Sequence, residues 1–190
     1  MKRPTKQARP TADLILDAAT PLFYGHGLRA VSLDQVAAAA GLTKRTLHYH
    51  FPTKNELVVA YLRRWRESAR AGLSENTAVP AGERIDAAFA RLEREVAHPA
   101  FRGCPFVNAV AELNDRAHPA TALAVAYKED RRIWFEATLR EVGVPCPGPV
   151  AEQVMVLWEG AIVRALVTRD ACVVGQARRA AAALIEAGQR

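Results

Sequence analysis

The sequence predicts an all-α protein of about nine helices, in which a compact three-helix head precedes a larger helical body. Three observations support this fold class. Apolar residues recur at helical spacing along most of the chain, and no segment of useful length alternates as a strand would. Alanine, which has the highest helix propensity, is abundant. With 190 residues, of which 50% are hydrophobic, the chain is also long enough to bury a core.

The first helix is expected over residues 11–24, after a polar and basic arm at residues 1–10. Gly25 and Gly27 are expected to end this helix, because glycine stops helices readily. Pro21 lies inside it and is expected to kink it or shift its register. The apolar face is predicted to consist of Leu14, Ile15, Ala18, Leu22 and Phe23.

Two capping boxes open later helices. In SLDQ, residues 32–35, Ser32 can accept a hydrogen bond from the Gln35 N–H while Gln35 reaches back to Ser32. The short helix that follows ends at Gly41. TKNE, residues 53–56, is the second box and opens a long helix that runs to about residue 74.

The rest of the chain is predicted to form five more helices. The links between them are either rich in Gly and Pro or short and polar, as helix connections are. These helices are expected at about residues 82–97, 105–116, 119–142, 149–169 and 173–188. The chain is accordingly divided into a head with its basic N-terminal arm, residues 1–52, and a body, residues 53–190.

The net charge of +6 is concentrated near the N-terminus. Residues 1–70 hold 12 Lys and Arg against 5 Asp and Glu, whereas residues 71–190 hold 14 against 15. The first segment therefore carries +7 and the second −1. A localised basic excess favours a polyanionic partner such as nucleic acid.

The stretch GLTKRTLHYHFPTKNEL, residues 41–57, follows the spacing of a helix-turn-helix: a short helix, a turn at Gly41 and a second short helix over Thr43–Phe51. The second helix of that motif enters the major groove of DNA and presents side chains to base edges. Leu47 and Phe51 are four residues apart and are expected to anchor it to the head.

Lys, Arg, Thr, Tyr and His side chains on this helix and beside it can bind phosphates or base edges. The candidate DNA-binding residues are Ser32, Thr43, Lys44, Arg45, Thr46, His48, Tyr49, His50 and Lys54. Two alternatives stay open. Tyr49 and His50 can have a purely structural role, packing the head on the connecting helix. Lys44, Arg45 and Lys54 can form an ordinary solvated face.

The pattern FYGHG-x3-VSLDQVAAAAGLTKRTLHYHFPTKNELVVAYL resembles the DNA-binding head of the TetR family of transcriptional regulators, over about residues 11–62. The matching positions are Phe23, Gly27, Ser32, Val36, Ala37, Gly41, Leu47, Tyr49, Phe51, Lys54 and Leu57. The resemblance implies a symmetric dimer built on the last two long helices, operator binding by the head and an effector pocket in the body. His48, where the family often has an aromatic phenol, and Pro21 depart from the pattern.

A pocket for a small molecule needs mostly apolar walls and a few placed polar groups. Asn108 and Glu112 share one helical face, as do Tyr127, Arg131 and Trp134 on the next long helix. The candidate effector-binding residues are Cys104, Asn108, Glu112, Tyr127, Trp134 and Trp158. Each of them can instead be an ordinary core or interface residue.

The last two helices carry alanine-rich apolar faces that permit close helix approach. The expected dimer interface consists of Val154, Trp158, Ala161, Ile162, Ala165, Ala177, Ala181 and Leu184. Burial of these faces inside one subunit is the alternative.

Several classes of site are not expected. There is no HExxH, P-loop or nucleophile elbow, so no catalytic residue is assigned. His48 and His50 point about 200° apart on a helix and cannot readily share a metal ion. Cys104, Cys146 and Cys172 form no CxxC, which argues against a disulfide framework or zinc site, and a redox role is a minor alternative. Because no apolar run approaches the roughly 18 residues of a membrane span, a cytoplasmic protein is expected.

The sequence therefore predicts a homodimeric, sequence-specific DNA-binding transcriptional regulator. It is interpreted as a repressor that leaves a near-palindromic operator when an unknown small organic effector binds, with no cofactor and no membrane partner. A helical enzyme and a non-specific architectural DNA binder are the rival classes.

Overall fold

The computed structural model describes residues 10–75 and 79–189, and within these the chain forms nine α-helices and no strand. The helices are α1 Thr11–His26, α2 Leu33–Ala39, α3 Lys44–His50, α4 Lys54–Glu75, α5 Ala81–Val96, α6 Pro105–Leu113, α7 Pro119–Glu141, α8 Pro147–Thr168 and α9 Cys172–Gly188. The predicted all-α class is confirmed. Apart from Pro10, the basic arm lies outside the described residues.

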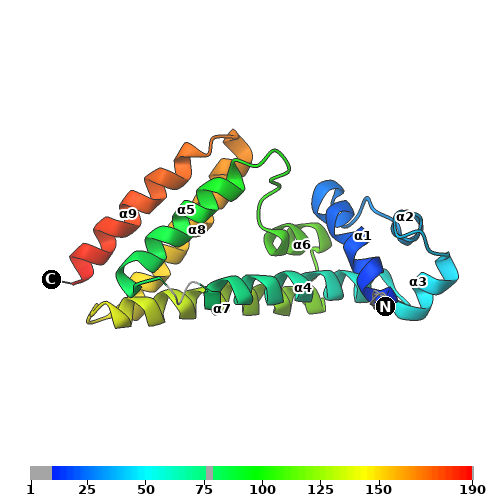
Figure 1. The fold of residues 1–190 in the computed structure, drawn as a ribbon, viewed down its shortest axis with the longest axis horizontal. Coiled ribbons are helices and arrows are strands. Elements are labelled where there is room, and N and C mark those ends of the chain that lie inside the picture. The colour runs from blue at the N-terminus through cyan, green and yellow to red at the C-terminus, as the bar shows by residue number, and fades with distance from the viewer. Residues whose placement is uncertain (1–9, 76–78, 190) are drawn as a thin grey trace, which may run out of the picture.

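Helices α1, α2 and α3 form the head, which lies at one end of the molecule (Figure 1). Its core collects the apolar faces of all three helices and of the start of α4, including Ile15, Phe23, Val36, Leu47 and Tyr61, each at most 3% exposed. Phe23 and Tyr61 meet edge to face with ring centroids 5.6 Å apart. This packing fixes α4 to the head.

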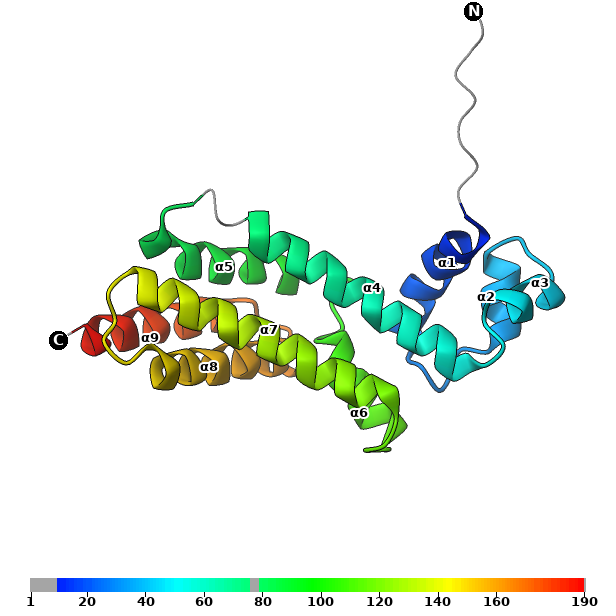
Figure 2. The same cartoon turned by 90° about the horizontal axis from the view of Figure 1, so that it is seen from below.

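Helix α4 leaves the head and runs into the body, where it packs along α7 (Figure 2). Arg66 of α4 forms two hydrogen bonds to the carboxylate of Asp130 on α7, at 2.6 and 3.0 Å. Two parallel N–H···O bonds of this kind fix relative orientation as well as distance. One continuous helix therefore mechanically joins the head to the body.

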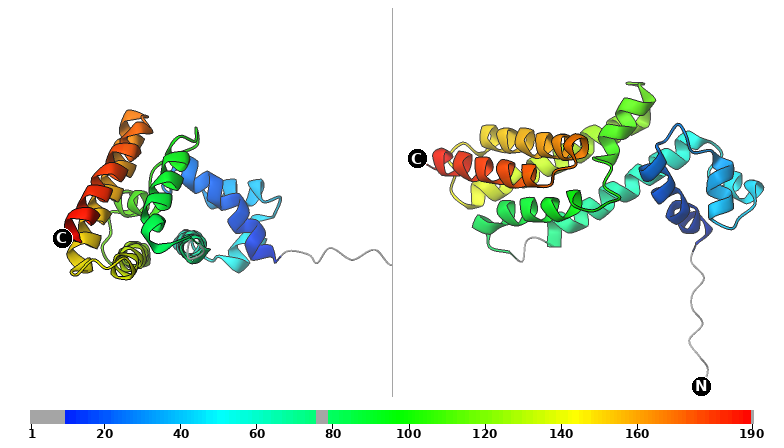
Figure 3. Two further views of the ribbon diagram at one scale, coloured as in Figure 1. Left: turned by 60° about the vertical axis from the view of Figure 1, so that its left-hand side comes forward. Right: turned by 90° about the horizontal axis from the view of Figure 1, so that it is seen from above.

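Helices α5, α8 and α9 lie together at the other end of the molecule, and the short helix α6 lies between this group and the head (Figure 3). Phe89, Phe135 and Trp158 meet edge to face where α5, α7 and α8 converge, with centroids 5.1 and 5.9 Å from the Trp158 ring. Aromatic pairs in this geometry stabilise by about 0.5–1.5 kcal/mol beyond their area. The body therefore has its own aromatic core.

Several element ends differ from the sequence prediction. Helix α1 runs through Gly25 to His26, and the chain leaves the helix only at Gly27, where φ is +91°. Helix α6 ends at Leu113 because Asn114 adopts a left-handed conformation with φ +49°.

Within the described residues, no helix is long and apolar enough to cross a membrane.

Candidate DNA-binding head and effector pocket

The turn between α2 and α3 is built from local hydrogen bonds that the sequence prescribes. The Ser32 hydroxyl accepts from the Gln35 N–H at 3.2 Å, and the Gln35 side chain accepts from the Ser32 N–H at 2.7 Å. Gly41 has φ +68°, which an L-residue adopts at a cost, and lets the Leu42 N–H reach the Ala37 carbonyl at 2.9 Å. The predicted capping box and glycine turn are both present.

Helix α3 presents one face to the head and the opposite face to solvent. Leu47 is fully buried and Phe51 is 9% exposed, which confirms the predicted anchor. Thr43 caps the helix by accepting from the Thr46 N–H at 3.1 Å. Arg45 is exposed, and the Tyr49 ring is 83% exposed with only an edge contact to His50. This outer face is free to meet a partner.

Two of the predicted DNA-binding cations already have partners. Lys44 forms an ion pair with Asp34 of α2 at 2.9 Å, between side chains that are each 62% exposed. Lys54 donates to the Arg29 carbonyl oxygen at 3.3 Å. Burial lowers the pKa of its ammonium group, and the nearby Glu112 carboxylate opposes this shift only in part. Arg45 has no ion pair among the described residues, so it is the cation that a new partner can engage without breaking a contact.

The structure gives His48 a structural contact. Its Nδ1 lies 3.2 Å from the Pro52 carbonyl oxygen, so this nitrogen carries the proton and donates. The bond braces the turn between α3 and α4 at the point where the second capping box begins. In that box the Thr53 hydroxyl accepts from the Glu56 N–H at 3.2 Å.

Ser32 and Thr46 complete the predicted set: both are near the surface of the head, at the starts of α2 and α3. The structure thus brings all nine candidate DNA-binding residues together around the helix-turn-helix. Among the described residues, no group of His, Cys, Asp and Glu is arranged to hold a metal ion.

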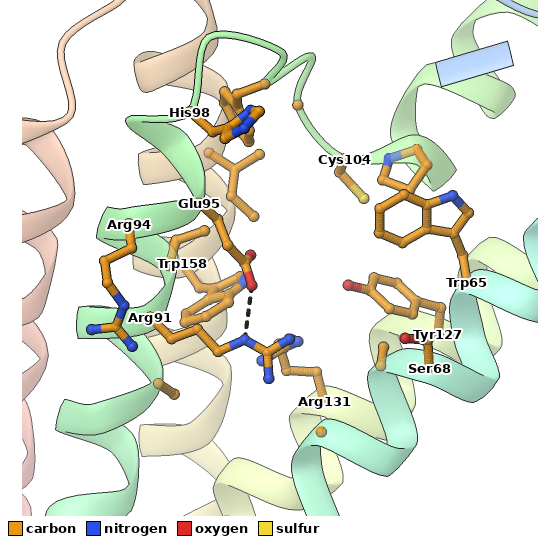
Figure 4. Close-up of a pocket in the computed structure, with 18 of the residues that line it drawn as sticks. Trp65, Ser68, Arg91, Arg94, Glu95, His98, Cys104, Tyr127, Arg131 and Trp158 are labelled. Atoms are coloured by element: carbon orange, nitrogen blue, oxygen red, sulfur yellow. Dashed lines mark hydrogen bonds and ion pairs between the residues drawn. The ribbon is translucent and has the colours of Figure 1, made fainter. Parts of the chain in front are cut away.

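A pocket of about 610 Å³ opens in the body between α4, α5, α7 and α8, under the loop that precedes α6 (Figure 4). Its walls are mainly apolar and aromatic, with a few charged side chains on opposite sides, which suits a small organic ligand. The polar and aromatic residues that line it include Tyr24, Trp65, Ser68, Arg91, Glu95, His98, Cys104, Tyr127, Arg131 and Trp158.

Three of the six predicted effector residues, Cys104, Tyr127 and Trp158, line this pocket. The other three do not. The Asn108 amide donates to the Arg102 carbonyl at 2.7 Å and braces the loop, while Trp134 packs on Phe135 with centroids 5.3 Å apart. Glu112 reaches the head instead of the pocket, because its helical face meets the turn between α1 and α2.

Glu112 ties α6 to that turn. Its carboxylate accepts from the Arg29 N–H at 3.0 Å, and it lies so close to Gly27 that an added Cβ would be 3.0 Å from its Oε2. This contact was not expected from the sequence, because the two residues are far apart in the chain.

Tyr24 is a second link between head and pocket. It belongs to α1, lines the pocket and packs against the Trp65 ring at 5.6 Å. Its hydroxyl donates to the Gly103 carbonyl at 3.0 Å and accepts from the Arg102 N–H at 2.9 Å. These contacts connect the loop before α6 directly to the first helix of the head.

Cys104 is buried, and its sulfur lies 3.4 Å from the Lys128 ammonium. That ammonium also donates to Glu159 of α8 at 2.6 Å, which balances its charge. Burial lowers the pKa of Lys128, but the nearby negative groups outweigh it and raise the pKa overall. Cys146 and Cys172 are exposed, and none of the three is in a disulfide.

The residues expected at the dimer interface lie inside the subunit, with one exception. Val154, Trp158, Ala161, Ile162, Ala165, Ala177 and Ala181 are each at most 9% exposed in the single chain, while Leu184 is half-buried. An amphipathic helix turns its most apolar face to its own core, and here that core is formed with α5 and α7. Most of the predicted interface residues are therefore already buried within the single chain.

The outer side of α8 carries a different apolar stripe. Val156, Val163 and Val167 are 66%, 51% and 75% exposed, and Gly160 lies between them with nothing near its Cβ position. On α9 the exposed positions Ala180, Ala183 and Ala187 repeat the same spacing. These two stripes are the exposed small apolar surfaces of the last two helices.

A helix-turn-helix head joined by one continuous helix to a helical body is an architecture of DNA-binding transcriptional regulators. Residues 15–61 match the family model described as bacterial regulatory proteins, tetR family. Residues 15–61 are therefore a DNA-binding domain of the TetR family of transcriptional regulators.

Individual relatives agree with this assignment. The transcriptional regulator TtgR of Pseudomonas putida is 35% identical over 86 residues, which are 43% of this chain and 41% of TtgR. The chain thus matches less than half the length of this relative. The regulator YjdC of Escherichia coli is 26% identical over 88% of this chain and 89% of YjdC. A TetR-family regulator from Streptomyces coelicolor has the same fold, with a TM-score of 0.88, 26% identity and coverage of 95% and 96% of the two chains.

Proposed function

We propose that this protein is a dimeric, sequence-specific DNA-binding regulator that represses transcription until a small organic effector enters the body. The exposed outer face of α3 carries the proposal. Arg45 and Tyr49 lie free on a helix that Leu47 and Phe51 hold rigidly, as a groove-reading helix requires. The TetR-family domain and the basic first third of the chain point the same way.

In this proposal two heads bind successive major grooves, roughly 34 Å apart, on a near-palindromic operator. Hydroxyl or ring contacts to the DNA come from Ser32, Thr43, Thr46, Tyr49 and His50. Lys44 and Lys54 neutralise phosphates after exchanging their present partners. His48 supports the turn to α4 and need not contact DNA itself.

Effector release is proposed to act through Tyr24 and Glu112, which connect the pocket loop and α6 to the head. A ligand that shifts the loop before α6 would turn α1 and change the separation of the two heads. By linkage, DNA must then weaken effector binding by the same factor.

The test is fluorescence anisotropy with DNA from upstream of the protein's own gene and with a shuffled duplex of equal length, across a range of salt concentrations. We expect specific binding at least about 1,000-fold tighter than binding to the shuffled DNA, with both weakening as salt rises. Equal affinity for the two duplexes would contradict a sequence-specific regulator and favour an architectural DNA binder.

A further inference from the structure

The Arg131 guanidinium lines the pocket and forms no ion pair with an acidic side chain among the described residues. Arg131 projects from α7, and its Cζ lies 4.4 Å from the centre of the Trp158 ring. Its Nε is buried and has no hydrogen-bond partner among the described residues. A buried donor without a partner is unfavourable, so a group that accepts from Arg131 would be favoured here.

The other cations around the pocket are balanced by acids or exposed. Arg91 donates to Glu95 at 2.8 Å within α5, and Lys128 pairs with Glu159. Arg94 of α5 also borders the cavity, but it is exposed to solvent (Figure 4). Among the described cations that line the pocket, Arg131 is therefore the one that is partly buried and has no acidic partner.

Tyr127 stands one helical turn from Arg131 and points into the same cavity (Figure 4). Burial raises the pKa of its hydroxyl, and the nearby Arg131 charge only partly opposes this. The hydroxyl consequently stays protonated at neutral pH and can donate. Arg131 and Tyr127 together offer donors for one small anion.

The remaining walls suit a flat ring. Tyr127 is stacked on Phe106 with centroids 4.0 Å apart and an interplanar angle of 13°, which holds its ring rigidly. Trp65 on α4 and Trp158 on α8 line other walls of the cavity. The indole N–H of Trp65 points away from the cavity, so this residue offers its ring as a contact surface (Figure 4). Aromatic walls favour an aromatic ligand by stacking and edge contacts.

We propose that the pocket binds a planar aromatic monocarboxylate, with its carboxylate on Arg131 and Tyr127 and its ring among the aromatic side chains. This inference rests on the proposed function, because it names the chemical class of the effector. A cationic ligand is disfavoured because Arg131 repels it and already covers the Trp158 ring. A dianion is disfavoured because Arg131 supplies one partly buried positive charge and the Glu95 carboxylate also lines the pocket.

Isothermal titration calorimetry of the full-length protein with three matched probes tests this class. Naphthalene-2-carboxylate, naphthalene-2-carboxamide and naphthalen-2-ylmethylammonium share one ring and differ in charge. We expect the carboxylate to bind at least 10-fold more tightly than the carboxamide, and the ammonium to bind most weakly. Equal affinities for carboxylate and carboxamide, or binding by none of the three probes, would overturn the proposal.

Substitutions of Arg131 test whether this residue binds the carboxylate of the ligand. Arg131→Gln should weaken carboxylate binding by about 10- to 100-fold while leaving carboxamide binding nearly unchanged, because charge-assisted hydrogen bonds are lost. Arg132→Gln removes the same charge from the next residue of α7, which does not line the pocket, and should change neither affinity. If both variants weaken the carboxylate alike, general electrostatics explain the binding and the assigned anchor is wrong. Arg131→Lys keeps the positive charge but loses the paired donors of the planar guanidinium. It should give an intermediate loss of carboxylate affinity, and it keeps the test valid if the glutamine variant does not fold.

The same preparations separate this inference from the proposed function. Without ligand, each variant should bind the protein's upstream DNA as the unaltered protein does. Normal DNA binding with no carboxylate selectivity overturns only the ligand class. Carboxylate binding that leaves the DNA complex intact supports the ligand class and contradicts effector release.

Discussion

At the residue scale, Arg45 and Lys44 are neighbours with equal charge and different surroundings. Lys44 is paired with Asp34, whereas Arg45 is exposed and has no ion pair among the described residues. An arginine fork can bind guanine O6 and N7 in the major groove, while a lysine acts mainly as a point charge on phosphate. The two side chains should therefore contribute to DNA binding in different ways.

We expect Arg45→Ala to cost about 1–3 kcal/mol of binding to the operator and to reduce the preference for one base position. Lys44→Ala and Lys54→Ala should weaken binding to all DNA sequences nearly equally. Each should also reduce the slope of log affinity against log salt concentration by about one, because one fewer counterion is released on binding. Affinities for a set of single-base operator variants at three salt concentrations measure both effects. If Arg45→Ala and the lysine variants give identical base preferences, this division of roles is wrong.

Local pattern predicted the residues of the head well because their partners are nearby in sequence. The Ser32–Gln35 box spans three residues, and the Leu47–Phe51 anchor spans four. The pocket was only partly predictable. Its walls come from Tyr24, Trp65, Arg91 and Arg131, which lie on four separate helices and meet only in the folded chain. The spacing of Tyr127 and Arg131 was the one local signal for the anion site.

At the element scale, the chain must leave α1 sharply to place α2 across it. Gly27 makes this turn with φ +91° and ψ +155°, a conformation that is essentially restricted to glycine. Gly25 lies two residues earlier inside α1 with no atom within 4 Å of its Cβ position. The sequence placed both glycines at the helix end, but their physical roles are opposite.

We expect Gly27→Ala to lower the free energy of unfolding by about 1–3 kcal/mol, because the backbone becomes strained and the new Cβ crowds Glu112. Gly25→Ala should leave stability unchanged or raise it by up to about 1 kcal/mol, since alanine favours the helix. Urea unfolding of the two variants provides the measurement. Equal destabilisation by both would show that the Gly27 conformation is not the cause.

The helices themselves were predicted nearly in place, because their apolar spacing and their Gly and Pro boundaries are local properties. Which face each helix buries was harder to predict. Asn108 and Glu112 share a face as expected, yet one braces the pocket loop and the other contacts the head. Helical periodicity shows which residues share one face of a helix. It does not show which neighbouring element that face contacts.

At the scale of the whole molecule, binding to a palindrome requires two heads held at a fixed separation. The most apolar face of α8, which includes Trp158, is already used in the subunit core. Substituting Trp158 would therefore disrupt the aromatic cluster with Phe89 and Phe135 before it could report on a dimer. The exposed small apolar residues of the last two helices, the valine stripe of α8 and the alanine stripe of α9, are the surface that we expect to pair.

We expect Val163→Glu to convert the dimer to a monomer, because a charge at the centre of that stripe would be buried without a partner when two subunits pair. Val125→Glu is the matched control: Val125 is 65% exposed on α7, outside the stripe, and its substitution should leave the dimer intact. Sedimentation equilibrium at several concentrations distinguishes the two states, and helical circular dichroism confirms that both variants fold. A dimeric Val163→Glu variant with unchanged association would show that the subunits pair through another surface. A monomeric variant should also bind the full operator hardly more tightly than a half-site, since the gain from binding two linked heads is lost.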